Sequence, residues 1–144
     1  MNNARKIKLF LVDDDSVYLK SLEIEFLQHA DFEIETFATG ELCVENLFKS
    51  PDIIILDYLL DGIDKTAMNG IETLDKIRAF DPGIPVVMLS AQDKIEVAVN
   101  CMHHKAFDYI VKSETAFFRL QKVIESIMYT QKIEKTLNWY MEKM

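Results

Sequence analysis

The stretch IIILD at residues 53–57 and the stretch IKLFLVDDD at residues 7–15 decide the fold, because each is a short apolar run that ends in carboxylates. Such runs are typical of buried strands in a parallel sheet. The carboxyl ends of parallel strands share one edge, where ligands bind, so we expect Asp13, Asp14 and Asp57 to converge there. Carboxylates at about 4 Å repel by roughly 4 kcal/mol per pair at an effective dielectric near 20. The three carboxyl groups therefore need a nearby cation, or their pKa values must be raised. This pattern predicts a pocket for a divalent metal and a phosphate.

The length and charge of the chain limit the kinds of protein it can be. Its 144 residues suffice for one domain with its own core. With 24 acidic against 16 basic residues, the net charge of −8 argues against direct binding to nucleic acid or an anionic membrane. There is no recognisable secretory signal, and no apolar run approaches the ~20 residues of a membrane span. Cys43 and Cys101 have no CxxC spacing and are predicted to be buried free thiols, so we expect a cytoplasmic protein.

Apolar runs and amphipathic stretches alternate five times, which predicts an α/β fold with a parallel sheet covered on both faces. The strands are expected at about residues 7–13, 32–37, 52–57, 86–90 and 107–111. The helices are expected from Ser16, taken as an N-cap, and then at about residues 40–49, 70–80, 93–104 and 115–144. The core stripe of the first helix should comprise Tyr18, Leu19, Leu22, Phe26 and Ala30.

The last predicted helix is longer than the sheet requires. Its first half should cover the sheet with Phe118, Leu120, Val123, Ile124, Ile127 and Met128. Residues 131–144 continue with apolar residues that a small core has no obvious room to bury: Ile133, Leu137, Trp139, Tyr140, Met141 and Met144. We therefore divide the chain into a domain at residues 1–130 and a helical extension at 131–144. Three interpretations of the extension remain open. It pairs with a partner helix, as in a homodimer, it folds back on the domain, or it is a linker.

Polar residues at the ends of four predicted strands suit phosphoryl transfer. Asp13 and Asp14 follow the first strand, Asp57 ends the third, Ser90 ends the fourth and Lys112 follows the fifth. A carboxylate can accept a phosphoryl group as a nucleophile, and other carboxylates can hold Mg²⁺, which prefers oxygen ligands. A lysine and a hydroxyl can neutralise and bind the phosphoryl oxygens.

These residues and their surroundings resemble the receiver domain of bacterial two-component response regulators. The resemblance covers about residues 5–130 and lies in LFLVDDD (9–15), IIILD (53–57), VVMLSA (86–91) and AFDYIVK (106–112), which occur in the family's order. It implies a flavodoxin-like sheet with strand order 2-1-3-4-5. It also implies a signalling switch that performs only phosphotransfer to itself and its own dephosphorylation.

The resemblance also assigns a role to each residue. Asp57 would be the phosphoacceptor, and Asp13, Asp14 and Asp57 would bind Mg²⁺ with the backbone carbonyl of Leu59 as a further ligand. Ser90 and Lys112 would contact the phosphoryl group, and Ser90 and the aromatic residue Tyr109 would form the switch. A sensor histidine kinase or a phosphotransfer protein would donate the phosphate. The face of the fourth helix, fifth strand and last helix would then bind a target protein or an output domain.

Three substitutions and one insertion depart from the family's pattern. Asp61 stands where a proline is usual, and about five extra residues, 63–67, follow Gly62. Asp64 or Lys65 in this loop is a candidate to reach the site. The alternative is that the loop is a solvated insertion without chemical consequence. Ser113 replaces a proline that usually has a cis peptide bond. Lys105 replaces a glycine at a position where a left-handed conformation is expected.

Other interpretations remain open from the sequence. Ser90 can be a plain helix cap, and Tyr109 a plain core aromatic. The altered loop and Ser113 are also compatible with a receiver-like docking module that is not phosphorylated. Residues 9–17, with Asp13 and Asp15, also resemble the first motif of haloacid-dehalogenase-type phosphatases, in which Asp13 would be the nucleophile. The residue that becomes phosphorylated distinguishes these alternatives.

Overall fold

Five parallel strands form one sheet in the order β2-β1-β3-β4-β5 in the computed structural model, which describes residues 6–29 and 31–144. The strands are β1 (Ile7–Val12), β2 (Phe32–Phe37), β3 (Ile53–Asp57), β4 (Val86–Ser90) and β5 (Asp108–Val111). Val12 pairs with Leu56, Asp57 with Leu89 and Ser90 with Val111, so the carboxyl ends of four strands are level. The predicted α/β fold and strand order are therefore confirmed.

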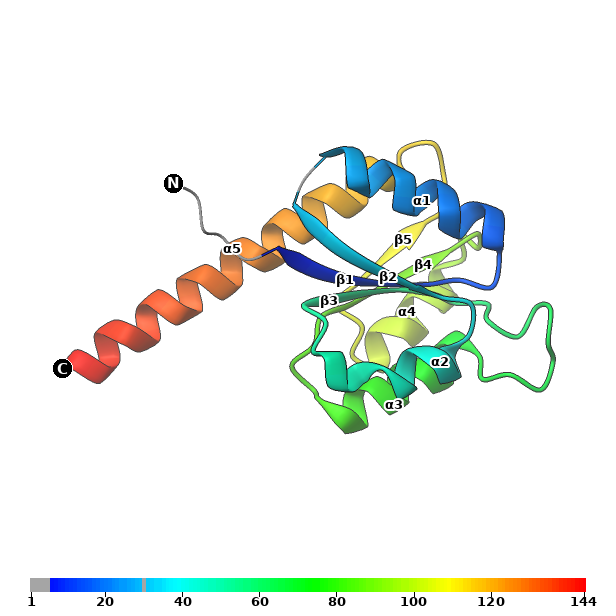
Figure 1. Ribbon diagram of the computed structural model, residues 1–144. Helices are drawn as coiled ribbons and strands as arrows, with labels where there is room; N and C mark the ends of the chain where they lie inside the picture. The colour runs from blue at the N-terminus through cyan, green and yellow to red at the C-terminus, as the bar shows by residue number, and fades with distance from the viewer. Residues whose placement is uncertain (1–5, 30) are drawn as a thin grey trace.

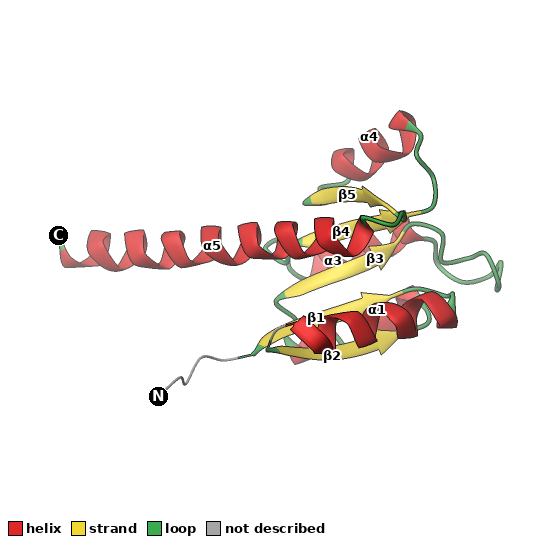
Figure 2. Ribbon diagram, turned by 90° about the horizontal axis from the view of Figure 1, so that it is seen from above, coloured by secondary structure: helices red, strands yellow, loops and turns green. Residues whose placement is uncertain are grey.

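Helices cover both faces of the sheet (Figures 1 and 2). The first face carries α1 (Ser16–His29) and α5 (Ala116–Lys143), and the second carries α2 (Gly40–Glu45), α3 (Gly70–Phe80) and α4 (Ile95–His103). Among the described residues, no helix is long and apolar enough to cross a membrane.

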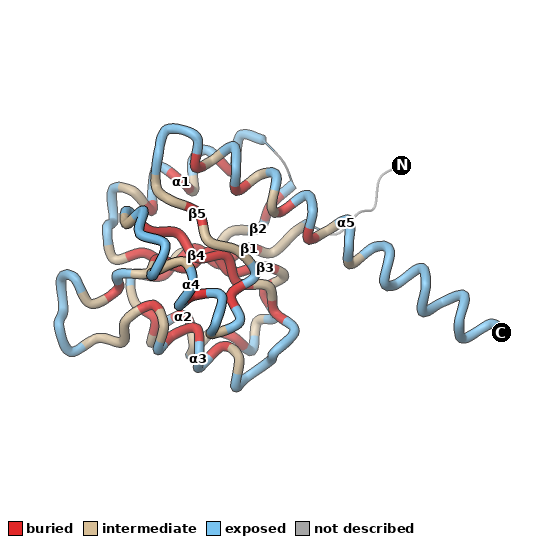
Figure 3. Tube along the Cα trace, turned by 180° about the vertical axis from the view of Figure 1, so that it is seen from behind, coloured by how far each residue is buried: buried red, intermediate tan, exposed pale blue. Residues whose placement is uncertain are grey.

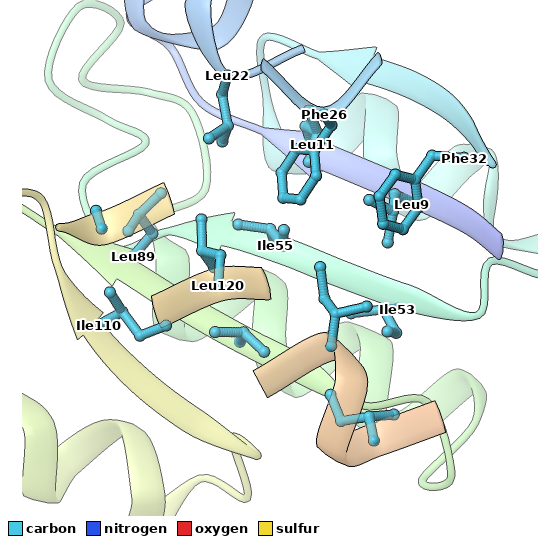
Figure 4. Packing of buried hydrophobic residues seen from close by; sticks show 14 of the residues in the cluster. Leu9, Leu11, Leu22, Phe26, Phe32, Ile53, Ile55, Leu89, Ile110 and Leu120 are labelled. Atoms are coloured by element: carbon cyan, nitrogen blue, oxygen red, sulfur yellow. The ribbon is translucent and has the colours of Figure 1, made fainter. Parts of the chain in front are cut away.

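Each face of the sheet has its own apolar core. Figure 4 shows the core under α1 and α5, where Phe26 and Phe32 pack edge to face with Leu9, Leu11 and Leu120 nearby. The second core joins α2, α3 and α4 to the sheet and buries both free cysteines, Cys43 and Cys101, as expected. Of the stripe predicted for α1, Leu19, Leu22 and Phe26 are buried and Tyr18 is half-buried. Ala30, like the first five residues of the predicted domain, lies outside the described residues.

Several predicted element ends were wrong by a few residues. Asp15, not Ser16, caps α1, because its carboxylate accepts the backbone N–H groups of Val17 (3.1 Å) and Tyr18 (3.2 Å). The helix expected through Lys49 ends at Glu45, and a 3₁₀ turn, η1 (Leu47–Lys49), follows it. The predicted starts of the fourth helix and fifth strand were one or two residues early.

α5 leaves the sheet halfway along its length. Ala116, Leu120, Ile124 and Ile127 are buried, but from Lys132 onward every residue is exposed (Figure 3). The prediction that Phe118 faces the core was wrong. Phe118 is 59% exposed, and its neighbour Phe117 instead packs against Phe26 at 4.9 Å between ring centroids.

Candidate functional site

Three carboxylates converge at the carboxyl edge of the sheet, as predicted. Asp13 follows β1, Asp57 ends β3, and both are buried, while Asp14 is half-buried. One oxygen from each of the three lies within 4.8 Å of the others. They border a pocket of about 200 Å³, whose lining also includes Asp15, Leu59, Ser90, Ala91, Gln92 and Lys112.

The turn after β3 and the start of α3 fix one side of this pocket. Gly70, the first residue of α3, lies so close to β3 that an added Cβ would be 2.6 Å from the backbone oxygens of Asp57 and Tyr58. The N–H of Gly70 donates to Tyr58 O at 3.0 Å, and Asn69 and Glu72 form a capping box. This close contact requires glycine and holds the end of β3 against α3.

Lys112 lies between the two buried carboxylates. Its Nζ is 2.8 Å from Asp13 Oδ2 and 3.5 Å from Asp57 Oδ1, and its side chain is 17% exposed. Burial alone would lower the pKa of Lys112, but the hydrogen bond to Asp13 and the charge of Asp57 raise it above its ordinary value. Lys112 is therefore a positively charged ammonium in the pocket.

One ammonium does not balance the negative charge of the pocket. Burial and the neighbouring charge of Asp13 raise the pKa of Asp57 to about 7, although Lys112 and a backbone hydrogen bond from Leu59 act in the opposite direction. Uncompensated carboxylate oxygens at this spacing match the ligands that Mg²⁺ prefers. The described residues Asp13, Asp14 and Asp57 therefore fit a magnesium ion.

Ser90 and Tyr109 bind the same residue of the loop after β4. Ser90 Oγ accepts the N–H of Gln92 at 3.0 Å, and the Tyr109 hydroxyl donates to the carbonyl oxygen of Gln92. Ser90 is not a helix cap, because α4 begins at Ile95 and Lys94 is at its N-cap position. The sequence did not predict a role for Gln92, because its contacts are made by backbone atoms and do not depend on the residue type.

The inserted loop at residues 63–67 is held at both ends. The N–H of Ile63 donates to Asp14 Oδ2 at 3.3 Å, and the N–H of Met68 donates to Glu41 Oε2 at 2.9 Å. Asp64 does not line the pocket, because its carboxylate binds Thr66 within the loop, and Lys65 is exposed. The loop therefore reaches the site through its backbone at Ile63, not through the side chains that the sequence suggested.

The other two departures have separate outcomes. Lys105 has φ 73°, so the left-handed conformation expected there is present in a lysine. None of the described peptide bonds is cis, including the bond between Lys112 and Ser113. Lys112 is still placed at the pocket, because its backbone N–H donates to Ser90 O at 2.7 Å and its ammonium binds Asp13.

Comparisons with known proteins agree with this geometry. Residues 9–125 match the family model described as the response regulator receiver domain. The transcriptional regulatory protein PrrA of Mycobacterium leprae is 34% identical over 106 residues, which are 73% of this chain and 43% of that protein. The chain spans less than half the length of this and the other curated relatives compared.

Two solved structures illustrate the likeness in three dimensions. NtrX from Brucella abortus superposes with a TM-score of 0.79 at 26% identity, over 93% of this chain and 30% of that one. The CheX-CheY-BeF3-Mg+2 complex from Borrelia burgdorferi superposes with a TM-score of 0.71 at 31% identity, over 83% of this chain and 88% of that one.

Proposed function

The chain belongs to the response regulator receiver family, and on this premise we propose that it is a switch controlled by phosphorylation of Asp57. The observation that carries the proposal is the placement of Lys112 between Asp13 and Asp57, at 2.8 Å and 3.5 Å, beside the buried hydroxyl of Ser90. A nucleophilic carboxylate, an ammonium and a hydroxyl are thus within one small pocket at the edge of the sheet.

The proposed reaction transfers a phosphoryl group to Asp57. A carboxylate oxygen of Asp57 forms a bond to phosphorus while the phosphorus–nitrogen bond of a phosphohistidine breaks. The imidazole leaves with the electron pair of that bond and takes up a proton from solvent. Lys112 neutralises charge on the phosphoryl oxygens, which is the main contribution that a protein makes to such transfers.

Mg²⁺ would be held by Asp13, Asp14 and Asp57, with the carbonyl of Leu59 as a further ligand, and when bound it supplies positive charge to the phosphoryl oxygens. Asp57 attacks only in its ionised form. Because its pKa is about 7 in the metal-free protein, added positive charge also increases the fraction of Asp57 that is ready to react.

The switch would work through Gln92. If Ser90 turns toward a phosphoryl group on Asp57, the N–H of Gln92 loses its acceptor, and the loop that also holds the Tyr109 hydroxyl is released. Tyr109 can then repack, and the surface of α4, β5 and α5 changes. The shift in population cannot exceed the difference in phosphate interaction energy between the two states.

The proposed partners are a sensor histidine kinase or phosphotransfer protein as donor, and a target protein or output domain as receiver of the signal. Exposed apolar residues on α4 and before β5 support a protein target at the switching surface: Ile95, Val99, Met102 and Phe107.

Phosphorylation of the full chain by phosphoramidate with Mg²⁺, followed by mass spectrometry, tests the proposal. We expect one phosphoryl group on Asp57, none in Asp57→Asn, and normal modification in Asp64→Asn, whose carboxylate lies in the inserted loop. Modification at Asp13 would instead support the phosphatase interpretation. A chain that neither accepts phosphate nor binds Mg²⁺ would support the docking module.

A second experiment tests the coupling separately. Ser90→Ala should still accept phosphate at Asp57, but its amide NMR shifts on the surface of α4, β5 and α5 should change less than those of the wild type. If the two proteins show the same changes, the route through Ser90 and Gln92 is wrong.

A further inference from the structure

An aromatic ring covers the ammonium of Lys112 from outside the pocket. Tyr18 lies in the first turn of α1, and its ring centroid is 4.4 Å from Lys112 Nζ. This distance is well inside the range of about 6 Å in which an ammonium is attracted to the face of an aromatic ring. Tyr18 is not among the residues that line the pocket, so it touches the lysine and leaves the phosphate site free.

The backbone of Tyr18 is held by its own element, and its ring is partly packed. Asp15 caps α1 and accepts the N–H of Tyr18 at 3.2 Å, and the ring packs at the border of the core under α1 and α5. Tyr18 is half-buried, and burial raises the pKa of its hydroxyl, so the ring stays neutral near neutral pH. The ring is therefore an uncharged, partly packed surface beside a long and flexible side chain.

The ammonium of Lys112 has three neighbours at different distances. Asp13 Oδ2 lies at 2.8 Å, Asp57 Oδ1 at 3.5 Å and the Tyr18 ring at 4.4 Å. Asp13 is the nearer of the two carboxylates, and the residue after the lysine, Ser113, is exposed. The ring gives the ammonium a contact that does not depend on either carboxylate.

We propose that Tyr18 is a positioning residue for Lys112: its ring holds the ammonium at the edge of the pocket, where the lysine can contact a phosphoryl group on Asp57. The proposal rests on the function proposed above for Asp57 and Lys112. Tyr18 does not touch the reacting atoms and acts only through the lysine. The competing explanation is that the ring merely fills space beside α1.

Replacement of Tyr18 by phenylalanine and by mono-, di- and trifluorophenylalanine separates the two roles. Fluorine withdraws charge from the face of the ring and changes its size very little, so attraction to the ammonium should weaken stepwise while packing is kept. The first readout is the mobility of the Lys112 side chain, measured by NMR relaxation of its ε-carbon at fixed pH in the metal-free full chain. The second is the rate of phosphorylation by phosphoramidate with Mg²⁺.

We expect the mobility of Lys112 to rise stepwise with fluorination. The phosphorylation rate should fall threefold to tenfold from phenylalanine to trifluorophenylalanine, or about 0.7 to 1.4 kcal/mol at 1.36 kcal/mol per tenfold. Tyr18→Phe should remain within twofold of the wild type. A mobility that does not change along the series would overturn the contact, and a stepwise mobility with a constant rate would overturn the positioning role. Absence of phosphorylation in the wild type as well would instead refute the proposed function of the site.

Discussion

Asp57 combines a negative charge with burial, and this makes the stability of the metal-free protein depend on pH. Its pKa is raised by burial and by Asp13 from 3.8 to about 7, so between these values the folded protein holds a proton that the unfolded chain has lost. The contribution of this group to the free energy of unfolding is therefore fully present below about pH 4, and it is lost as the pH rises through about 7. The whole loss is at most about 4 kcal/mol.

Asp57→Asn should remove this dependence, because an amide has no proton to lose in that range. Urea unfolding at pH 5 and pH 8 in the absence of divalent metal measures it: the variant should be the more stable protein at pH 8 and should show a smaller slope with pH. Asp64→Asn is the matched control and should keep the wild-type slope. A slope that is unchanged in Asp57→Asn would place the titrating group elsewhere.

Lys105 stores backbone strain just before β5. A non-glycine residue with φ 73° is in the left-handed region, which costs roughly 1–2 kcal/mol for residues with a Cβ. Lys105→Gly should raise the free energy of unfolding by about 1 kcal/mol, less than the full strain because glycine also loses more entropy on folding. Lys105→Ala, which keeps the Cβ, is the control and should change stability little. Equal stability of the two variants would contradict the strain.

At the scale of residues, sequence reasoning found those side chains whose placement follows from topology. Asp13, Asp57, Ser90 and Lys112 meet because each stands at the end of a parallel strand, and that edge is common to all strands. Tyr18 was predicted only as a core residue, from its helical spacing. Its contact with Lys112 was missed, because the two positions are 94 residues apart in the chain. A contact between residues so far apart in the chain cannot be predicted from local sequence patterns.

The inserted loop links the second acidic residue of the pocket to the protein surface. Ile63 N–H donates to Asp14 Oδ2, an oxygen on a carboxylate that would also bind Mg²⁺. Binding of the ion should draw Asp14 away from this donor. We therefore predict that Mg²⁺ shifts the amide signal of Ile63 and speeds its hydrogen exchange, because that N–H loses its acceptor.

The amide of Thr66 provides an internal control for this titration. It donates to Asp64 within the loop at 2.9 Å and should respond less than Ile63. In Asp14→Ala the response of Ile63 should disappear. Equal shifts at Ile63 and Thr66 would show that the loop does not sense the metal through Asp14.

At the scale of elements, hydrophobic periodicity predicted each strand and each main helix, but not their ends. The side chain of Asp15 competes with that of Ser16 as the cap of α1, and only the geometry of the turn selects between them. The helix expected through Lys49 stops early because Asn46 is in a non-helical conformation with φ −107° and ψ 8°. Such ends depend on the backbone geometry of single residues, which hydrophobic periodicity does not record.

At the scale of the whole molecule, the exposed end of α5 requires support. An isolated helix of this length is marginal in water, yet residues 132–143 continue the helix beyond the sheet. Ile133, Leu137 and Tyr140 recur at spacings of three and four on one exposed stripe. We predict that two chains pair through this stripe about a two-fold axis, the commonest symmetry of soluble oligomers.

Sedimentation of the full chain and of a truncation that ends at Thr130 checks this pairing. The full chain should form a dimer, and the truncation should be a monomer. Leu137→Asp should disrupt the dimer far more than Asn138→Asp, which adds the same single negative charge at an exposed position away from the stripe. If the full chain and the truncation are both monomers at high micromolar concentration, with and without a phosphate mimic, the extension does not pair.

The direction in which α5 leaves the sheet has a mechanical consequence. The helix begins at Ala116, shortly after Lys112, and projects beyond the opposite edge of the sheet from the inserted loop (Figure 1). Its 28 residues give a rod of about 42 Å at 1.5 Å per residue. A tilt of about 5° at its first turn would move the far end by about 4 Å on this length. If a rearrangement next to the pocket tilted α5, the helix would act as a lever arm, and the displacement at its far end would be as wide as a side chain.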